Sequence, residues 1–218
     1  MVGAMWTSAN MAYATYDEPT SREGLFMTIR LTLVCAAASS ERGVRFGGDA
    51  PLNERALGEA RRVAGSLPVA AAWCTAPSQR CRQTAQALGG NAVSVEPGLR
   101  DMDMGRWQGR TLDEVSAGDA AGLAVWMSDP EAAPHGGESV SEVCRRVATW
   151  LEELPAGSGR TVAVVEQAVA RAALLHALGA PRQAFWRVDV PPLSAFQLTG
   201  RSGRWNLRIG AVGSDEPR

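Results

Sequence analysis

One apolar segment constrains the fold of this chain more than any other. The run Ile29–Val34 (IRLTLV) is rich in aliphatic and β-branched residues, which is typical of a strand buried on both faces. Thr161–Val165 (TVAVV) is a second run of this kind. Strand and helix signals alternate from Ile29 onward. This order predicts a single α/β domain with a largely parallel sheet.

The ends of the helices are marked by residues with capping chemistry. Asn53 suits an N-cap, Pro77 suits the first turn of a helix, and Gly89 suits a C-terminal cap. Capping-box spacings at 111–114 and 139–142 predict that a helix begins at each.

The predicted strands are 30–35, 70–74, 93–95 and 161–165 with a closing hairpin of 194–199 and 205–209. The predicted helices include 53–67 and 168–178.

The composition excludes several classes of function. The 218 residues carry a net charge of −1 and no basic run, so nucleic-acid binding is not expected. All 22 cationic residues are arginine, which excludes Schiff-base chemistry at a lysine. No apolar run is long enough to span a bilayer. None of the four cysteines forms a C-x-x-C pair, so we expect no metal site and no disulfide framework, and a reduced, cytoplasmic setting.

The chain is predicted to have one domain with short extensions. Residues 1–26 lack the cationic start and apolar core of a signal peptide and lack clean periodicity. We expect them to form an arm peripheral to the domain at 27–210, with a C-terminal tail at 211–218. The alternative is that the arm packs on the domain or on a partner.

Five motifs follow one another in a recognisable order. The chain strongly resembles the histidine phosphatase (phosphoglycerate mutase-like) superfamily over nearly all of 29–209. The resemblance implies a three-layer fold with helices on both faces of a mostly parallel sheet, no metal or organic cofactor, and a possible homodimer. The motifs are Phe46 through Arg55 with Asp49-Ala50-Pro51-Leu52, Thr75-Ala76-Pro77-Ser78-Gln79-Arg80, Leu99-Arg100-Asp101 through Gly109, Pro134-His135-Gly136-Gly137-Glu138-Ser139, and Val164-Val165-Glu166-Gln167 through Arg171.

The departures from the family pattern fall on its chemistry. In the family the first strand ends in Arg-His-Gly, and this histidine accepts the phosphoryl group; here Cys35 and Ala36 follow the strand. Glu166 falls on the family's second histidine, and Arg42 falls near its loop asparagine. The resemblance leaves two members of the working set in place: Arg80, which holds phosphate, and Asp101, the proton donor.

These departures argue against phosphoryl transfer. A covalent phosphoryl intermediate needs a nucleophile and a cationic cradle, and alanine offers no lone pair at position 36. A phosphate dianion beside Glu166 and Asp101 is repelled, at a cost of roughly 4 kcal/mol for one like-charge contact at about 4 Å. We expect Glu166 and Arg80 to form an ion pair in the vacated phosphate site. The alternative is that Glu166 and Asp101 supply acid–base catalysis for another reaction.

Other candidates around the pocket have structural alternatives. His135 lies in the Gly-Gly-Glu-Ser loop and is a candidate substitute base or nucleophile, or else a loop residue. Cys35 is a candidate thiol nucleophile, although buried cysteines usually pack as small apolar residues. The predicted pocket residues are Cys35, Ala36, Arg42, Arg80, Asp101, His135, Glu138, Ser139, Glu166 and Gln167.

Three functions are compatible with this pattern. The first is a pseudophosphatase that binds a small ligand or a protein partner without transferring phosphate. The second is an enzyme with non-phosphoryl chemistry in the same pocket, using Asp101, Glu166 and Arg80. The third is a weak phosphatase of small phosphate esters.

Overall fold

The computed structural model describes residues 28–38, 45–157 and 159–208. The predicted arm 1–26, the tail 211–218 and the candidate pocket residue Arg42 therefore lie outside the described residues.

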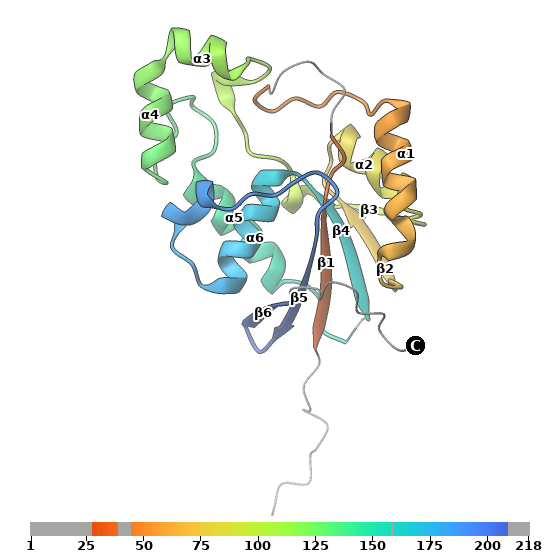
Figure 1. The fold of residues 1–218 in the computed structure, drawn as a ribbon. Coiled ribbons are helices and arrows are strands. Elements are labelled where there is room, and N and C mark those ends of the chain that lie inside the picture. The colour runs from red at the N-terminus through yellow and green to blue at the C-terminus, as the bar shows by residue number, and fades with distance from the viewer. Residues whose placement is uncertain (1–27, 39–44, 158, 209–218) are drawn as a thin grey trace, which may run out of the picture.

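A six-stranded mixed sheet forms the centre of the fold, in the order β3-β2-β4-β1-β5-β6 (Figure 1). Four strands are parallel and contain the two apolar runs that the sequence marks as buried. The last two form the antiparallel closing hairpin. The predicted α/β class is confirmed. The strands are β1 (Ile29–Cys35), β2 (Ala72–Thr75), β3 (Ser94–Val95), β4 (Arg160–Val165), β5 (Ala195–Arg201) and β6 (Arg204–Arg208).

Helices lie on both sides of this sheet. Figure 1 shows α1 and α2 on one side and α5 and α6 on the other, while α3 and α4 stand together beyond the end of the sheet. The helices are α1 (Glu54–Val63), α2 (Gln79–Ala87), α3 (Leu112–Gly118), α4 (Ala120–Ser128), α5 (Val140–Glu152) and α6 (Gln167–Leu178), with 3₁₀ segments at Ala64–Ser66, Pro97–Leu99, Gly105–Trp107 and Arg182–Arg187.

The predicted caps are mostly where the sequence puts them. Asn53 caps α1 with its side chain, and both capping boxes are formed, at the start of α3 and of α5. Pro77 differs from the prediction: it precedes the helix, and Ser78 caps α2 by accepting a hydrogen bond from the Cys81 amide. Gly89 follows the cap residue Leu88 with a positive φ of 89°.

Helix α4 was not predicted from the sequence. Its nine residues (AAGLAVWMS) are mostly apolar on every side, so they carry little helical periodicity. Asp119 begins the helix by accepting a hydrogen bond from the Gly122 amide. The signal for α4 was therefore its cap and not its periodicity.

The sheet order brings three predicted loop regions to one edge. The strands β2, β4 and β1 are adjacent and parallel, so their C-terminal ends lie together. Cys35 pairs with Val165, and the Ala36 amide donates to the Val165 carbonyl at 2.9 Å. The chain leaves β4 directly into Glu166 and α6. This edge is the place at which ligands bind in open α/β sheets.

Two loops that frame this edge are locked together through glycine. The Glu138 amide donates to the Asp103 carbonyl at 2.8 Å, and the Arg106 amide donates to the His135 carbonyl at 2.9 Å. A Cβ on Gly137 would overlap the backbone carbonyl of Asp103. A side chain at this position therefore separates the two loops.

We predict opposite effects for two glycine-to-alanine substitutions. Gly137→Ala should lower the free energy of unfolding by about 3 kcal/mol, because backbone must move to admit the new methyl group. Gly58→Ala should raise it by about 1 kcal/mol, because this position in α1 has open space around it and alanine favours the helix. Urea denaturation measures both changes, and equal effects of the two substitutions would contradict the steric argument.

Candidate functional site

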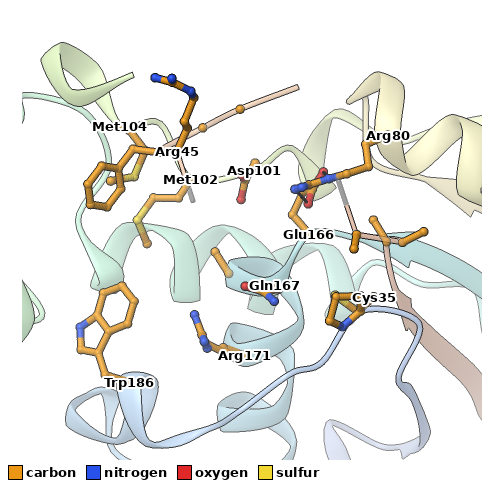
Figure 2. A pocket seen from close by; sticks show the side chains of 18 of the residues that line it. Cys35, Arg45, Arg80, Asp101, Met102, Met104, Glu166, Gln167, Arg171 and Trp186 are labelled. Carbon is orange, nitrogen blue, oxygen red and sulfur yellow. Dashed lines mark hydrogen bonds and ion pairs between the residues drawn. The ribbon is translucent and has the colours of Figure 1, made fainter. Parts of the chain in front are cut away.

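A cavity of about 500 Å³ opens at the C-terminal ends of β1 and β4 (Figure 2). Of the ten predicted pocket residues, six line this cavity: Cys35, Ala36, Arg80, Asp101, Glu166 and Gln167. The cavity walls come from the segments after β1 and β4, the start of α2, the segment around Asp101, and the 3₁₀ segment near Trp186. The other lining residues are Ala37, Ala38, Arg45, Phe46, Gly47, Gly48, Met102, Met104, Trp126, Ala168, Arg171, Trp186 and Pro192.

The polar end of the cavity is closed by an ion pair. Glu166 is only 2% exposed, and its carboxylate binds the Arg80 guanidinium with both oxygens. Ser78 Oγ donates to Glu166 Oε1 at 2.8 Å. Burial works against the charged form of Arg80, but Glu166 outweighs it and raises the pKa of the guanidinium above its usual value. The ion pair predicted from the sequence is thus present.

Asp101 lies beside this pair and holds its proton unusually tightly. Burial raises the pKa of its carboxyl to about 7, and the negative charge of Glu166 acts in the same direction. A hydrogen bond with the Met102 backbone and the charge of Arg80 oppose the shift. A carboxyl with this pKa exchanges its proton near neutrality, which is the property required of a general acid or base.

Cys35 lies at the end of β1 but has the wrong chemistry for a nucleophile. Its side chain is 1% exposed, and burial followed by the charge of Glu166 raises the pKa of the thiol to about 12. The thiolate, which is the reactive form, is therefore scarce at neutral pH. The thiol of Cys81, at 3.4 Å from Glu166 Oε1, also has a pKa raised well above its usual value by burial.

Among the described residues, no group of three or more His, Cys, Asp or Glu is placed to hold a metal ion.

The other end of the cavity is apolar and carries a cation that sequence reasoning missed. Met102, Met104, Trp126 and Trp186 line it together with Arg171, and Figure 2 shows Arg171 directed into the space between Trp186 and Gln167. The Nε of Arg171 donates to the Val188 carbonyl at 2.8 Å. One signal was available: Arg171 follows Gln167 by four residues, which places both on one face of α6.

Three predicted pocket residues lie elsewhere. His135 is 2% exposed and packs between the rings of Trp107 and Trp126, at centroid distances of 5.0 and 6.0 Å. Its Nδ1 accepts a hydrogen bond from the Gly137 amide at 3.0 Å, and burial lowers its pKa. The tight contact between the 103–105 and 135–137 backbones holds this side chain in the aromatic cluster, out of the cavity lining.

Glu138 and Ser139 are occupied by structural contacts. The carboxylate of Glu138 binds Arg100 at 2.7 Å and Arg146 at 2.8 Å. Ser139 caps α5 through the Glu142 amide. Both residues were expected on the pocket wall. They do not line the cavity but anchor the loop that frames it.

The sequence model of one protein family matches the region that contains this site. Residues 35–210 match the histidine phosphatase superfamily (branch 1). The chain belongs to the histidine phosphatase superfamily. The expected family is thereby confirmed, together with the fold that it implies.

Some of the curated relatives are phosphatases by name. A glucosyl-3-phosphoglycerate phosphatase of Mycolicibacterium vanbaalenii is 39% identical over 111 residues, which cover 46% of this chain and 49% of that protein. The bifunctional protein Rv2228c of Mycobacterium tuberculosis is 33% identical over 135 residues, covering 58% and 37%. This chain therefore spans half or less of the length of these curated relatives.

Solved structures share the fold over most of the chain. A mycobacterial glucosyl-3-phosphoglycerate phosphatase in complex with VO3 superposes with a TM-score of 0.70 at 26% identity, covering 83% of this chain and 98% of that one. An alpha-ribazole phosphatase from Shigella flexneri gives a TM-score of 0.73 at 20% identity, covering 86% of this chain and 100% of that one. This likeness concerns the fold alone.

Among the helices of the described residues, none has the length and apolarity needed to cross a membrane.

The Arg80–Glu166 pair predicts an asymmetric response to substitution. Arg80→Gln should lower the free energy of unfolding by about 3 kcal/mol, because it leaves a carboxylate buried without its counter-charge. Glu166→Gln should cost less, because the Arg80 side chain is 21% exposed and retains access to water. The double variant should lose clearly less than the sum of the two, which a double-mutant cycle in urea measures. The exposed Arg82 of α2 provides the control, since Arg82→Gln should be close to neutral, and additive effects at 80 and 166 would show that the pair is not coupled.

The raised pKa of Asp101 predicts a pH dependence of stability. The folded state binds this proton more tightly than the unfolded state, so the group stabilises the fold at low pH and this contribution is lost between the usual pKa of 3.8 and about 7. Asp101→Asn removes the titration. The difference in free energy of unfolding, variant minus wild type, should therefore increase by a few kcal/mol as the pH rises from about 4 to about 7. Above that pH the difference should stay constant. A constant difference over this range would refute the shift.

Proposed function

We propose that this protein is a pseudophosphatase, which keeps the histidine phosphatase fold, binds a small ligand in the cavity and does not transfer phosphoryl groups. One observation carries the proposal: Arg80, the residue that the family resemblance assigns to phosphate, is held by the buried carboxylate of Glu166. The carboxylate occupies the edge of the guanidinium formed by Nε and one terminal nitrogen and neutralises its charge, so Arg80 attracts a phosphate ester only weakly.

Among the described residues, the three positions considered for a histidine-like or thiol nucleophile do not supply one. By the resemblance, Ala36 falls at the position of the accepting histidine, and a methyl group has no lone pair. Cys35 is held as a thiol by its high pKa. His135, the remaining candidate, packs in the aromatic cluster outside the cavity lining.

The charges of the polar end disfavour a phosphate dianion as well. A dianion there meets Glu166, and Asp101 adds a second negative charge whenever it is ionised. One like-charge contact at about 4 Å costs roughly 4 kcal/mol at an effective dielectric constant near 20. The attraction of Arg80 and the repulsion of Glu166 largely cancel, so the pair offers a dianion little net attraction, and the uncompensated repulsion is that of ionised Asp101.

A second candidate function has one observation in its favour. Asp101 lines the cavity and has a pKa of about 7, so an enzyme that moves a proton on a non-phosphate substrate is compatible with the site. Glu166 contributes to this chemistry by raising the Asp101 pKa and not as a second base, because its own oxygens are engaged by Arg80 and Ser78.

The rival hypothesis is a phosphatase of small phosphate esters, which the names of the curated relatives favour. We predict no hydrolysis of para-nitrophenyl phosphate or of glucosyl-3-phosphoglycerate above a blank, measured by phosphate release. Turnover that Arg80→Ala abolishes would refute the pseudophosphatase.

A matched variant tests whether the three departures account for the absence of activity. The triple variant Cys35→Arg, Ala36→His, Glu166→His supplies the nucleophile and frees Arg80. It should gain phosphatase activity at least about tenfold above the wild type, which corresponds to roughly 1.4 kcal/mol of transition-state stabilisation. The double variant that keeps Glu166 is the control and should remain inactive.

The state of the cysteines bears on where this protein works. We propose a cytoplasmic location, because all four cysteines are free and buried. A protein partner and a homodimer remain predictions, which light scattering and copurification test.

A further inference from the structure

The cavity has two ends with different charge balance. At the polar end, Arg80 and Glu166 neutralise each other. At the apolar end, Met102, Met104, Trp126 and Trp186 surround space next to Arg171. We call these four side chains the apolar wall.

Arg171 carries a charge that no carboxylate holds in an ion pair among the described residues. In the part of the chain that the structure describes, no acidic oxygen lies within ion-pair distance of Arg171, and the one hydrogen bond recorded for it is that of Nε to the Val188 carbonyl. Its guanidinium carbon lies 5.8 Å from the Phe185 ring centroid and 5.6 Å from that of Trp186. Burial lowers the pKa of Arg171, and the negative charge of Asp189, which lies beyond ion-pair distance, acts in the opposite direction. A partly buried cation on aromatic rings, with its terminal nitrogens open to a cavity, is a typical anchor for an anion.

The start of α6 adds to the positive potential at the same place. Gln167 and Ala168 form the first turn of this helix and line the cavity. Glu166 occupies the N-cap position but its side chain makes no capping hydrogen bond, because it turns to Arg80. The positive end of the helix is therefore not neutralised by its own cap.

The geometry points to a specific class of ligand. We propose that the cavity binds a small monocarboxylic acid with an aromatic or aliphatic body: the carboxylate pairs with the terminal nitrogens of Arg171, and the body packs on the apolar wall. This inference rests on the proposed function, since it takes the cavity as a site for a ligand other than a phosphate ester.

A single negative charge fits this cavity better than a double one. Arg171 neutralises one charge, and its planar guanidinium matches the two oxygens of a carboxylate. The second charge of a phosphate ester would need another free cation. Arg45, which also lines the cavity, donates to the Gly109 carbonyl at 2.9 Å and lies 3.9 Å from Glu114, while Arg80 is neutralised.

Binding of matched probes to the full-length protein tests the proposal. Phenylpropionate is compared with its neutral amide, phenylpropionamide, and with phenyl phosphate, by titration calorimetry and ligand-observed NMR. We expect the acid to bind at least about tenfold more tightly than the amide, because the amide has the same body but no charge for Arg171. Phenyl phosphate should bind no more tightly than the acid.

Two substitutions separate the charge from the packing. Arg171→Gln should remove the preference for acid over amide, whereas Trp186→Ala should weaken both probes by a similar factor. Arg82→Gln, outside the cavity, is the control and should leave all affinities unchanged. The comparison of acid with amide in the wild type needs no substitution and therefore stands even where a variant fails to fold.

The outcomes distinguish this inference from the proposed function. Equal binding of acid and amide, an acid preference that survives in Arg171→Gln, or no saturable binding of the acid overturns the inference while leaving the absence of phosphatase activity untouched. Hydrolysis of phenyl phosphate by the wild type overturns the proposed function. Binding of phenyl phosphate without hydrolysis, but more tightly than the acid, overturns the charge argument alone.

Discussion

The ion pair between Arg80 and Glu166 is the interaction on which the site depends. A carboxylate that is 2% exposed cannot remain ionised without a counter-charge, and Arg80 supplies it from the first turn of α2. Ser78, the N-cap of the same helix, donates to the same carboxylate. The end of β4 is thereby tied to the start of α2. This link places fixed, mutually neutralised charges where the family resemblance would put a phosphate.

The same carboxylate controls the ionisation of its neighbours. Glu166 holds Arg80 charged, and it adds to burial in raising the pKa values of Asp101 and Cys35. Burial and, after it, the charge of Glu166 therefore keep Cys35 as a thiol and raise the pKa of Asp101 to about 7. A histidine at this position would act in the opposite direction whenever it is protonated, because a positive charge lowers the pKa of a nearby carboxyl or thiol.

The sequence predicted the features of this protein that depend on local chemistry. Buried runs gave the central strands, and the spacing of Ser139 with Glu142 gave a helix start, because such signals act over a few residues. The site was predicted where a side chain directly follows a strand, as for Glu166. His135 was misplaced because its direction is set by the packing of Trp107 and Trp126 and by a backbone contact across about thirty residues. Trp186 was missed for a different reason: its 3₁₀ segment has no periodicity that would mark a pocket wall.

Charge balance, more than shape, divides the cavity into two parts. A neutralised pair attracts an anion weakly even when the pair contains an arginine, because the carboxylate repels what the guanidinium attracts. Arg171 is in no ion pair among the described residues, although Asp189 acts on it from a greater distance. It lies one helical turn from a helix start without a side-chain cap, so the two positive contributions add. The change from phosphate chemistry to another ligand then needs no change of fold. On the proposed function, it needs only that one carboxylate neutralises the old anion site, while a cation on the next turn of α6 is left outside any ion pair.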